Sequence, residues 1–230
     1  MKKIVKGLGI VGACCLALSA SAATITYSTA TGATTGGGAV SATATFTTGD
    51  GTLDITLQNL LANPGNIAQV ISDLEFTLSG GQTTGTLTSS SGTTIFVNSD
   101  HSTTPGTTGP TGWGLNQNVA GGLQLDALGF VGPAGLLIGP GPYTDANASI
   151  AGNGPHNPFI DQTATFSLSI AGVTADSTVT SATFSFGTTE GAELVPGFPP
   201  EGGPVPDGGM TVTLLGVAFT GLALVRRKLS

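Results

Sequence analysis

Apolar residues at every second position are the feature that most limits what this chain can fold into. The alternation is clearest in four segments: TLDITLQNL (52–60), SDLEFTLSG (72–80), ATFSLSIAG (164–172) and TSATFSFGT (180–188). Successive side chains of a strand point to opposite faces, so this pattern predicts strands with one buried face. No stretch of the body shows a convincing 3.6-residue period. We therefore predict an all-β fold, an antiparallel β-sandwich or jelly roll.

Five further segments follow the same pattern more weakly, with Gly, Asn, Asp and Pro between them: 24–28, 39–48, 85–89, 93–98 and 122–128. Two long segments without the pattern are expected to be loops, at 99–114 and 139–159. Loops of this length are uncommon in compact domains and often carry function. We expect one β domain over residues 23–190, and then a Pro/Gly linker at 191–204.

Every Lys and Arg lies near one end of the chain, beside an apolar run. These residues are Lys2, Lys3, Lys6, Arg226, Arg227 and Lys228. Because the body between them has neither Lys nor Arg, its stability has to rest on apolar burial and backbone hydrogen bonds. It also offers no cation to a phosphate, which argues against a nucleic-acid partner.

The N-terminus has the layout of a secretory signal peptide. MKKIVKGLGIVGACCLALSASAA starts with basic residues, continues with an apolar run and ends with small residues. We expect an apolar signal helix within residues 1–22. Ala20 and Ala22 are the small residues that signal peptidase needs, and the expected cut lies between Ala22 and Ala23. A lipobox ending at Cys14 is the competing interpretation, but the apolar run continues past that residue.

The C-terminus repeats this arrangement in reverse. Residues 210–225 carry no charge, and as a helix they would be about 24 Å long. Arg226, Arg227 and Lys228 follow and would stop transfer, holding the end in the cytoplasm by the positive-inside rule. We predict a transmembrane helix at about 210–225, the only membrane contact of an otherwise exported chain.

A short motif precedes this helix: Val205, Pro206, Asp207, Gly208 and Gly209. The order of motif, apolar helix and basic cluster resembles the PEP-CTERM class of bacterial sorting signals, in its VPDSG-type variant, with Gly208 where the variant usually has Ser. The resemblance is confined to residues 205–230. It implies recognition by an exosortase-like membrane protease, transient anchoring, and then release or transfer to the cell surface or exopolysaccharide. A plain tail anchor is the alternative.

Few residues of the body suggest catalysis. Asp100, His101 and Ser102 are the residue types of a hydrolytic triad, but a triad draws its members from separate segments and adjacent loop residues point in different directions. His156 is interpreted as part of a turn. We therefore expect no catalytic residue, no enzyme activity and no cofactor.

Two binding features remain as weak candidates. Asp145 and Asn147 place oxygen donors at alternating positions, which suits Ca²⁺, although Asx-turns explain them without a metal. Trp113, flanked by glycines, could stack on a sugar ring, although a packing role is favoured.

These observations predict an exported protein of the cell surface or extracellular (biofilm) matrix with a structural or adhesive body. Its expected partners are signal peptidase, an exosortase-like protease and, as a further candidate, exopolysaccharide. Two alternatives stay open for the body. One is a carbohydrate-binding module of the exopolysaccharide matrix, and the other is a secreted glycan-active hydrolase.

Overall fold

The computed structural model describes residues 22–200, whose regular structure consists almost entirely of strands. The elements are β1 (Thr24–Thr29), β2 (Thr34–Thr35), β3 (Gly38–Ala39), β4 (Ala42–Gly49), β5 (Thr52–Asn59), the short 3₁₀ helix η1 (Ile67–Gln69), β6 (Ile71–Leu78), β7 (Thr86–Val97), β8 (Thr103–Gly109), β9 (Gly114–Val119), β10 (Gly122–Asp126), β11 (Leu137–Ile138), β12 (Phe159–Ser169), β13 (Val179–Phe186) and β14 (Leu194–Phe198). No helix in this range is long and apolar enough to cross a membrane. The predicted signal helix (1–22, except its last residue) and transmembrane helix (210–225) lie outside the described residues.

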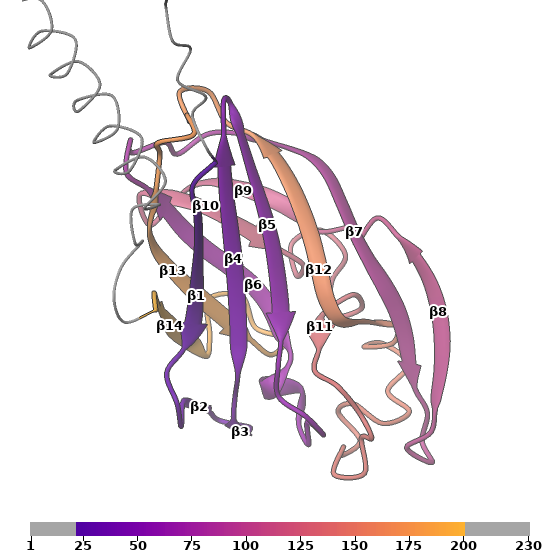
Figure 1. The fold of residues 1–230 in the computed structure, drawn as a ribbon. Helices are drawn as coiled ribbons and strands as arrows, with labels where there is room; N and C mark the ends of the chain where they lie inside the picture. Colours follow the sequence, from indigo (N-terminus) through magenta and orange to yellow (C-terminus); the bar gives the residue numbers. More distant parts are fainter. Residues whose placement is uncertain (1–21, 201–230) are drawn as a thin grey trace, which may run out of the picture.

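The strands form one sheet that closes on itself. Neighbours run in the order β12, β5, β4, β1, β14, β13 and β6, and the short strand β11 pairs with both β12 and β6. Figure 1 shows β1, β4, β5 and β12 as the front wall, with β13, β6 and β10 behind. The prediction of an all-β fold is confirmed. The prediction of a sandwich of two sheets is wrong in its finer part, because the eight strands make a closed, barrel-like sheet.

β11 makes this closure. Leu137 pairs with Ile160 of β12 in parallel and with Ile71 of β6 in antiparallel. Leu137 and Ile138 are fully buried. Buried backbone groups need hydrogen-bond partners, which the facing edges of β12 and β6 supply. A two-residue strand is too short to show a period of two, so the sequence pattern did not reveal it.

Two hairpins extend the closed sheet. β7 and β8 continue it beyond β12, and β10 and β9 continue it beyond β6. β8 lies inside the segment 99–114 that we expected to be a loop. Most of its side chains are exposed and it contains Pro105, as suits an edge strand without a buried face. An apolar alternation is therefore missing there.

The interior confirms the alternating pattern. In β4 and β5, buried and partly exposed residues alternate along nearly the whole strand. Leu53, Ile55 and Leu57 are almost completely buried, and the rings of Phe46 and Phe76 lie 5.5 Å apart across the interior. Each fully buried side chain of this kind contributes about 1.5–3 kcal/mol, so the body is held by its apolar interior.

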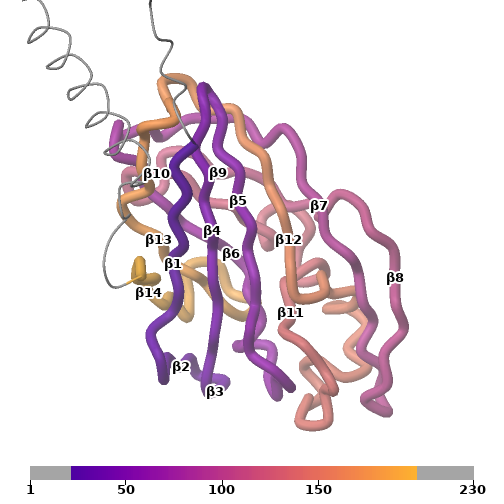
Figure 2. Tube along the Cα trace, viewed as in Figure 1, coloured from indigo at the N-terminus to yellow at the C-terminus, as the bar shows by residue number. Residues whose placement is uncertain are grey.

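Both ends of the body are held within the sheet. The Ala23 N–H donates to the Ala175 carbonyl, and the Ala23 carbonyl accepts from the Thr48 N–H. β14 lies in the predicted linker, yet it pairs with both β1 and β13. Figure 2 shows β14 beside β1. This pairing shows that the sheet continues past residue 190. Val195 of β14 is buried, although the sequence around it is rich in Pro and Gly.

Candidate functional site

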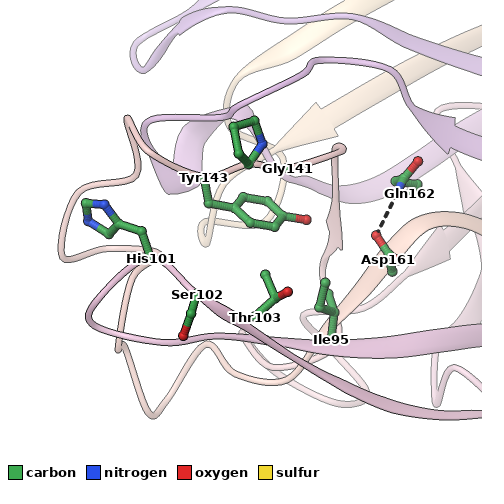
Figure 3. A pocket seen from close by; sticks show the side chains of 9 residues that line it. Ile95, His101, Ser102, Thr103, Gly141, Tyr143, Asp161 and Gln162 are labelled. Carbon is green, nitrogen blue, oxygen red and sulfur yellow. Dashed lines mark hydrogen bonds between the residues drawn. The ribbon is translucent and has the colours of Figure 1, made fainter.

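Two hollows on the body gather polar side chains. The first, called here the loop pocket, has a volume of about 370 Å³ and lies where β7, the turn before β8, the long loop 139–159 and β12 meet (Figure 3). Its lining residues are Ile95, His101, Ser102, Thr103, Gly141, Pro142, Tyr143, Asp161 and Gln162. It thus joins the two long segments that the sequence marked as loops.

Tyr143 forms the floor of the loop pocket. Its ring is 1% exposed and lies between His101 on one side and Asp161 on the other (Figure 3). Its hydroxyl donates to the Gly139 carbonyl at 2.9 Å. Burial, and then the charge of Asp161, raise the pKa of Tyr143 well above its ordinary value, so the hydroxyl stays a neutral donor.

Three residues of the pocket have left-handed backbone conformations. The φ angles of His101, Tyr143 and Gln162 are 67°, 63° and 60°. A non-glycine residue in this region costs about 1–2 kcal/mol, and such residues cluster at functional sites. The register between β12 and β7 also shifts between Ile160 and Ala164. This bulge lies where Asp161 and Gln162 line the pocket, and bulges of this kind re-aim side chains.

His101 has no triad around it. The Ser102 hydroxyl donates to Asp100 Oδ1 at 2.6 Å, and the Ser102 N–H donates to the same oxygen at 3.1 Å. These two bonds, the side-chain bond most of all, lower the pKa of Asp100. Because the serine is bonded to the carboxylate and not to the imidazole, these three residues form a tight turn.

The second hollow, called here the polar-face pocket, lies on the outer face of β6, β9 and β10 and has a volume of about 560 Å³. Its lining residues are Glu75, Asn116, Gln117, Val119, Gln124, Glu190 and Gly191. Strand register sets two polar rows beside it. Asp126, Asp73 and Ser185 form one row across β10, β6 and β13, and Gln124 and Glu75 start the next.

Asp73 and Asp126 are a buried carboxyl pair, 0% and 1% exposed. Burial, a hydrogen bond to Asp126 and the negative charges of Asp126 and Glu190 raise the pKa of Asp73 to about 8, against a smaller opposing effect of Ser72. Asp73 is therefore protonated at neutral pH and donates to Asp126, which also accepts from Asn116 Nδ2 at 2.9 Å. Within residues 22–200, Asp73 Oδ1 has no hydrogen-bond partner.

The predicted calcium residues do not converge on a site. Asp145 and Asn147 are exposed, and Asn147 Oδ1 accepts from the Ser149 N–H at 2.8 Å in an Asx-turn. Within the described part of the chain, no group of three His, Cys, Asp or Glu side chains could hold a metal ion.

The two remaining residues singled out from the sequence have structural contacts. Trp113 is 4% exposed, packs against Phe166 at 5.4 Å and donates its Nε1–H to the Gly135 carbonyl at 2.8 Å. It therefore belongs to the interior and offers no platform for a sugar. His156 contacts the Ser149 carbonyl through Nδ1, within a turn.

Neither the buried carboxyl pair nor the loop pocket was predicted as a site from the sequence. Asp73 and Glu75 are two residues apart in a strand, as are Gln124 and Asp126. This spacing was the available signal, because it places each pair of polar side chains on one face. The pocket residues come from segments whose meeting no local pattern reports.

The sorting residues lie mostly outside the described range: Ala20, Val205, Pro206, Asp207, Gly208, Gly209, Arg226, Arg227 and Lys228. Comparison with known protein families finds a VPDSG-CTERM motif at residues 204–229. The predicted resemblance is confirmed, and the C-terminus is a PEP-CTERM-type sorting signal. Such a signal indicates an exported protein that an exosortase-type membrane enzyme sorts to the surface. No curated protein and no solved structure matches the chain.

Proposed function

We propose that this chain is a non-enzymatic surface protein whose β body serves as a structural or adhesive component after both terminal signals are removed. The observation that carries the proposal is the VPDSG-CTERM motif at residues 204–229, which follows a closed β body. An exosortase-type enzyme cuts at this signal, and a transient membrane anchor becomes a surface or matrix protein.

The position of the body relative to its signals supports processing at both ends. β14 ends at Phe198, and only residues 199–203 precede the motif. A cut at the motif leaves every strand in place. At the other end, a cut between Ala22 and Ala23 leaves β1 whole, and the Ala23 hydrogen bonds to Ala175 and Thr48 persist.

The buried carboxyl pair does not support the alternative of a glycan-active hydrolase. The carboxyls of Asp73 and Asp126 are buried and hydrogen-bonded to each other. A glycoside hydrolase needs two carboxyls on either side of a substrate cleft, about 5–9.5 Å apart. The hydrolase alternative therefore gains nothing from this pair. The carbohydrate-binding alternative finds its support in the loop pocket.

Substitutions in the motif test the sorting half of the proposal. We expect P206A with D207N to leave the protein in the membrane fraction of its native host, whereas the unchanged chain reaches the surface or the medium. E201Q, just before the motif, removes one carboxylate and is the matched control that should sort normally. Normal release of the P206A/D207N protein would reject exosortase sorting through this motif.

A further inference from the structure

The loop pocket combines three kinds of lining group in one small space. Asp161 and Gln162 form one wall, with Gln162 Nε2 donating to Asp161 Oδ1 at 3.0 Å. Thr103, the first residue of β8, brings a hydroxyl, and His101 brings an imidazole from the turn before it, whereas the Ser102 hydroxyl is bonded to Asp100. The remaining lining is apolar: Pro142 is exposed, Ile95 is half-buried, and the Tyr143 ring is buried behind the surface (Figure 3).

This combination fits the two-sided chemistry of a sugar ring. Each sugar hydroxyl both donates and accepts, and the carboxylate, the amide and the Thr103 hydroxyl of the pocket can answer both needs. The C–H face of a sugar is apolar and can rest on the side formed by the exposed Pro142 and the half-buried Ile95. The volume of about 370 Å³ lies at the small end of the ligand-pocket range of roughly 300–1,000 Å³, which suits one ring.

The charge of the pocket selects among sugars. Asp161 contributes a carboxylate, and the sequence has no Lys or Arg between residues 7 and 225 to offset it. Phosphate and uronic-acid groups would therefore meet uncompensated repulsion.

The lining is held in place before any ligand arrives. The Asn98–Ser102 turn is closed by bonds from His101 N to Asn98 O at 3.0 Å and from Asn98 N to Ser102 O at 2.9 Å. Tyr143 is fixed by its bond to Gly139, and Asp161 by its pairing with Ile138 of β11. The entropic cost of ordering the lining backbone when a ligand binds is therefore small. Left-handed backbone at three lining positions is typical of such preorganised functional sites.

We propose that the loop pocket binds one neutral sugar ring, with Asp161 and Gln162 hydrogen-bonding its hydroxyls and the Pro142 and Ile95 side carrying its C–H face. This gives the adhesive body of the proposed function a ligand class. The sugar proposal rests on the proposed function only for the place where the protein meets its ligand, which is the cell surface or matrix. Binding by the purified chain does not require sorting.

The test uses the exported protein purified from an expressing host. Saturation-transfer NMR and titration calorimetry would be run with glucose, galactose, mannose, N-acetylglucosamine and their β-linked disaccharides, with glucuronic acid as the charged comparison. We expect at least one neutral sugar to bind and glucuronic acid not to bind. D161N should raise Kd about tenfold or more, because it removes a charge-assisted hydrogen bond.

A second variant separates binding from folding. Gln162 is exposed and has a φ of 60°, a conformation that glycine adopts without cost. Q162G should therefore keep or raise the Tm while it weakens sugar binding. D145N, on the long loop 139–159 but outside the pocket lining, is the control and should bind normally.

Three results with the sugar panel and the two loop-pocket variants would overturn the proposal, and a fourth comes from E75Q. The first three are no binding by any neutral sugar of the panel, equal affinity in the unchanged chain, D161N and Q162G, and a preference for glucuronic acid. If E75Q in the polar-face pocket abolished binding while D161N did not, the sugar would belong to that other pocket and the loop-pocket assignment would be wrong. Failure of sorting with intact sugar binding would reject the proposed function alone.

Discussion

The buried carboxyl pair makes stability depend on pH in an unusual direction. Asp73 has its pKa raised to about 8 in the folded chain, against 3.8 for an ordinary Asp. Between these values the folded state keeps a proton that the unfolded state has released. The unfolded state thus binds fewer protons, and stability must fall as pH rises from about 4 to about 8. Below that window both states are protonated and the penalty vanishes.

The size of this effect follows from the two pKa values. Each pKa unit corresponds to about 1.4 kcal/mol, so the full penalty is at most about 5–6 kcal/mol. About 4 kcal/mol of it should develop between roughly pH 5 and pH 9. That is a large share of the 5–15 kcal/mol typical of a whole domain, and it should lower Tm by about 10 °C.

Replacing Asp73 isolates this contribution. D73N keeps the shape of the side chain and a donor toward Asp126, but it has no proton to lose. Urea unfolding of the unchanged chain should show stability falling steeply toward pH 9, whereas D73N should be nearly flat over this window and more stable at pH 9. E75Q, on the same face of β6, is the matched control and should keep the steep dependence. A D73N profile parallel to that of the unchanged chain would refute this reasoning.

Two further predictions concern the interior, and unfolding by urea measures both. W113F removes the bond from Nε1 to the Gly135 carbonyl and should cost about 1–3 kcal/mol, with W113A costing about 3–5 kcal/mol because packing against Phe166 is also lost; a cost within error would place Trp113 outside the interior. G139A puts a Cβ within 2.0 Å of the Leu61 carbonyl oxygen and should cost more than about 2 kcal/mol, whereas G109A meets no atom within 4 Å and should be close to neutral. Equal costs for the two glycine variants would contradict the packing at Gly139.

The long, half-buried strands were predictable because a strand with one buried face has apolar residues at every second position. Leu53, Ile55 and Leu57 alternate with polar residues because β5 has an interior and an exterior face. The short or exposed strands that complete the sheet show no such alternation. β11 is two residues long, and β8 has no buried face. The closed sheet therefore could not be told from a sandwich by periodicity.

The candidate sites divide in the same way. The sorting signal is linear, so its motif, apolar run and basic cluster could be recognised in order. The loop pocket depends on Tyr143 and Asp161 meeting His101 across three segments, which only the folded chain decides. The Asp73–Asp126 pair could be predicted only with the register of β6 against β10, and this register cannot be read from the sequence.

The central claim is that the chain is exported, processed at both ends and left at the surface. The most direct test is the intact mass of the protein recovered from its native host, from the cell-bound and the shed fractions. Whole-protein mass is also the practical choice, since trypsin finds no Lys or Arg between Ala23 and Val225. We predict a chain that starts at Ala23 and ends near the motif around Pro206, without either cysteine. A mass that still includes Arg226, Arg227 and Lys228 in both fractions would contradict the account and leave a tail-anchored membrane protein.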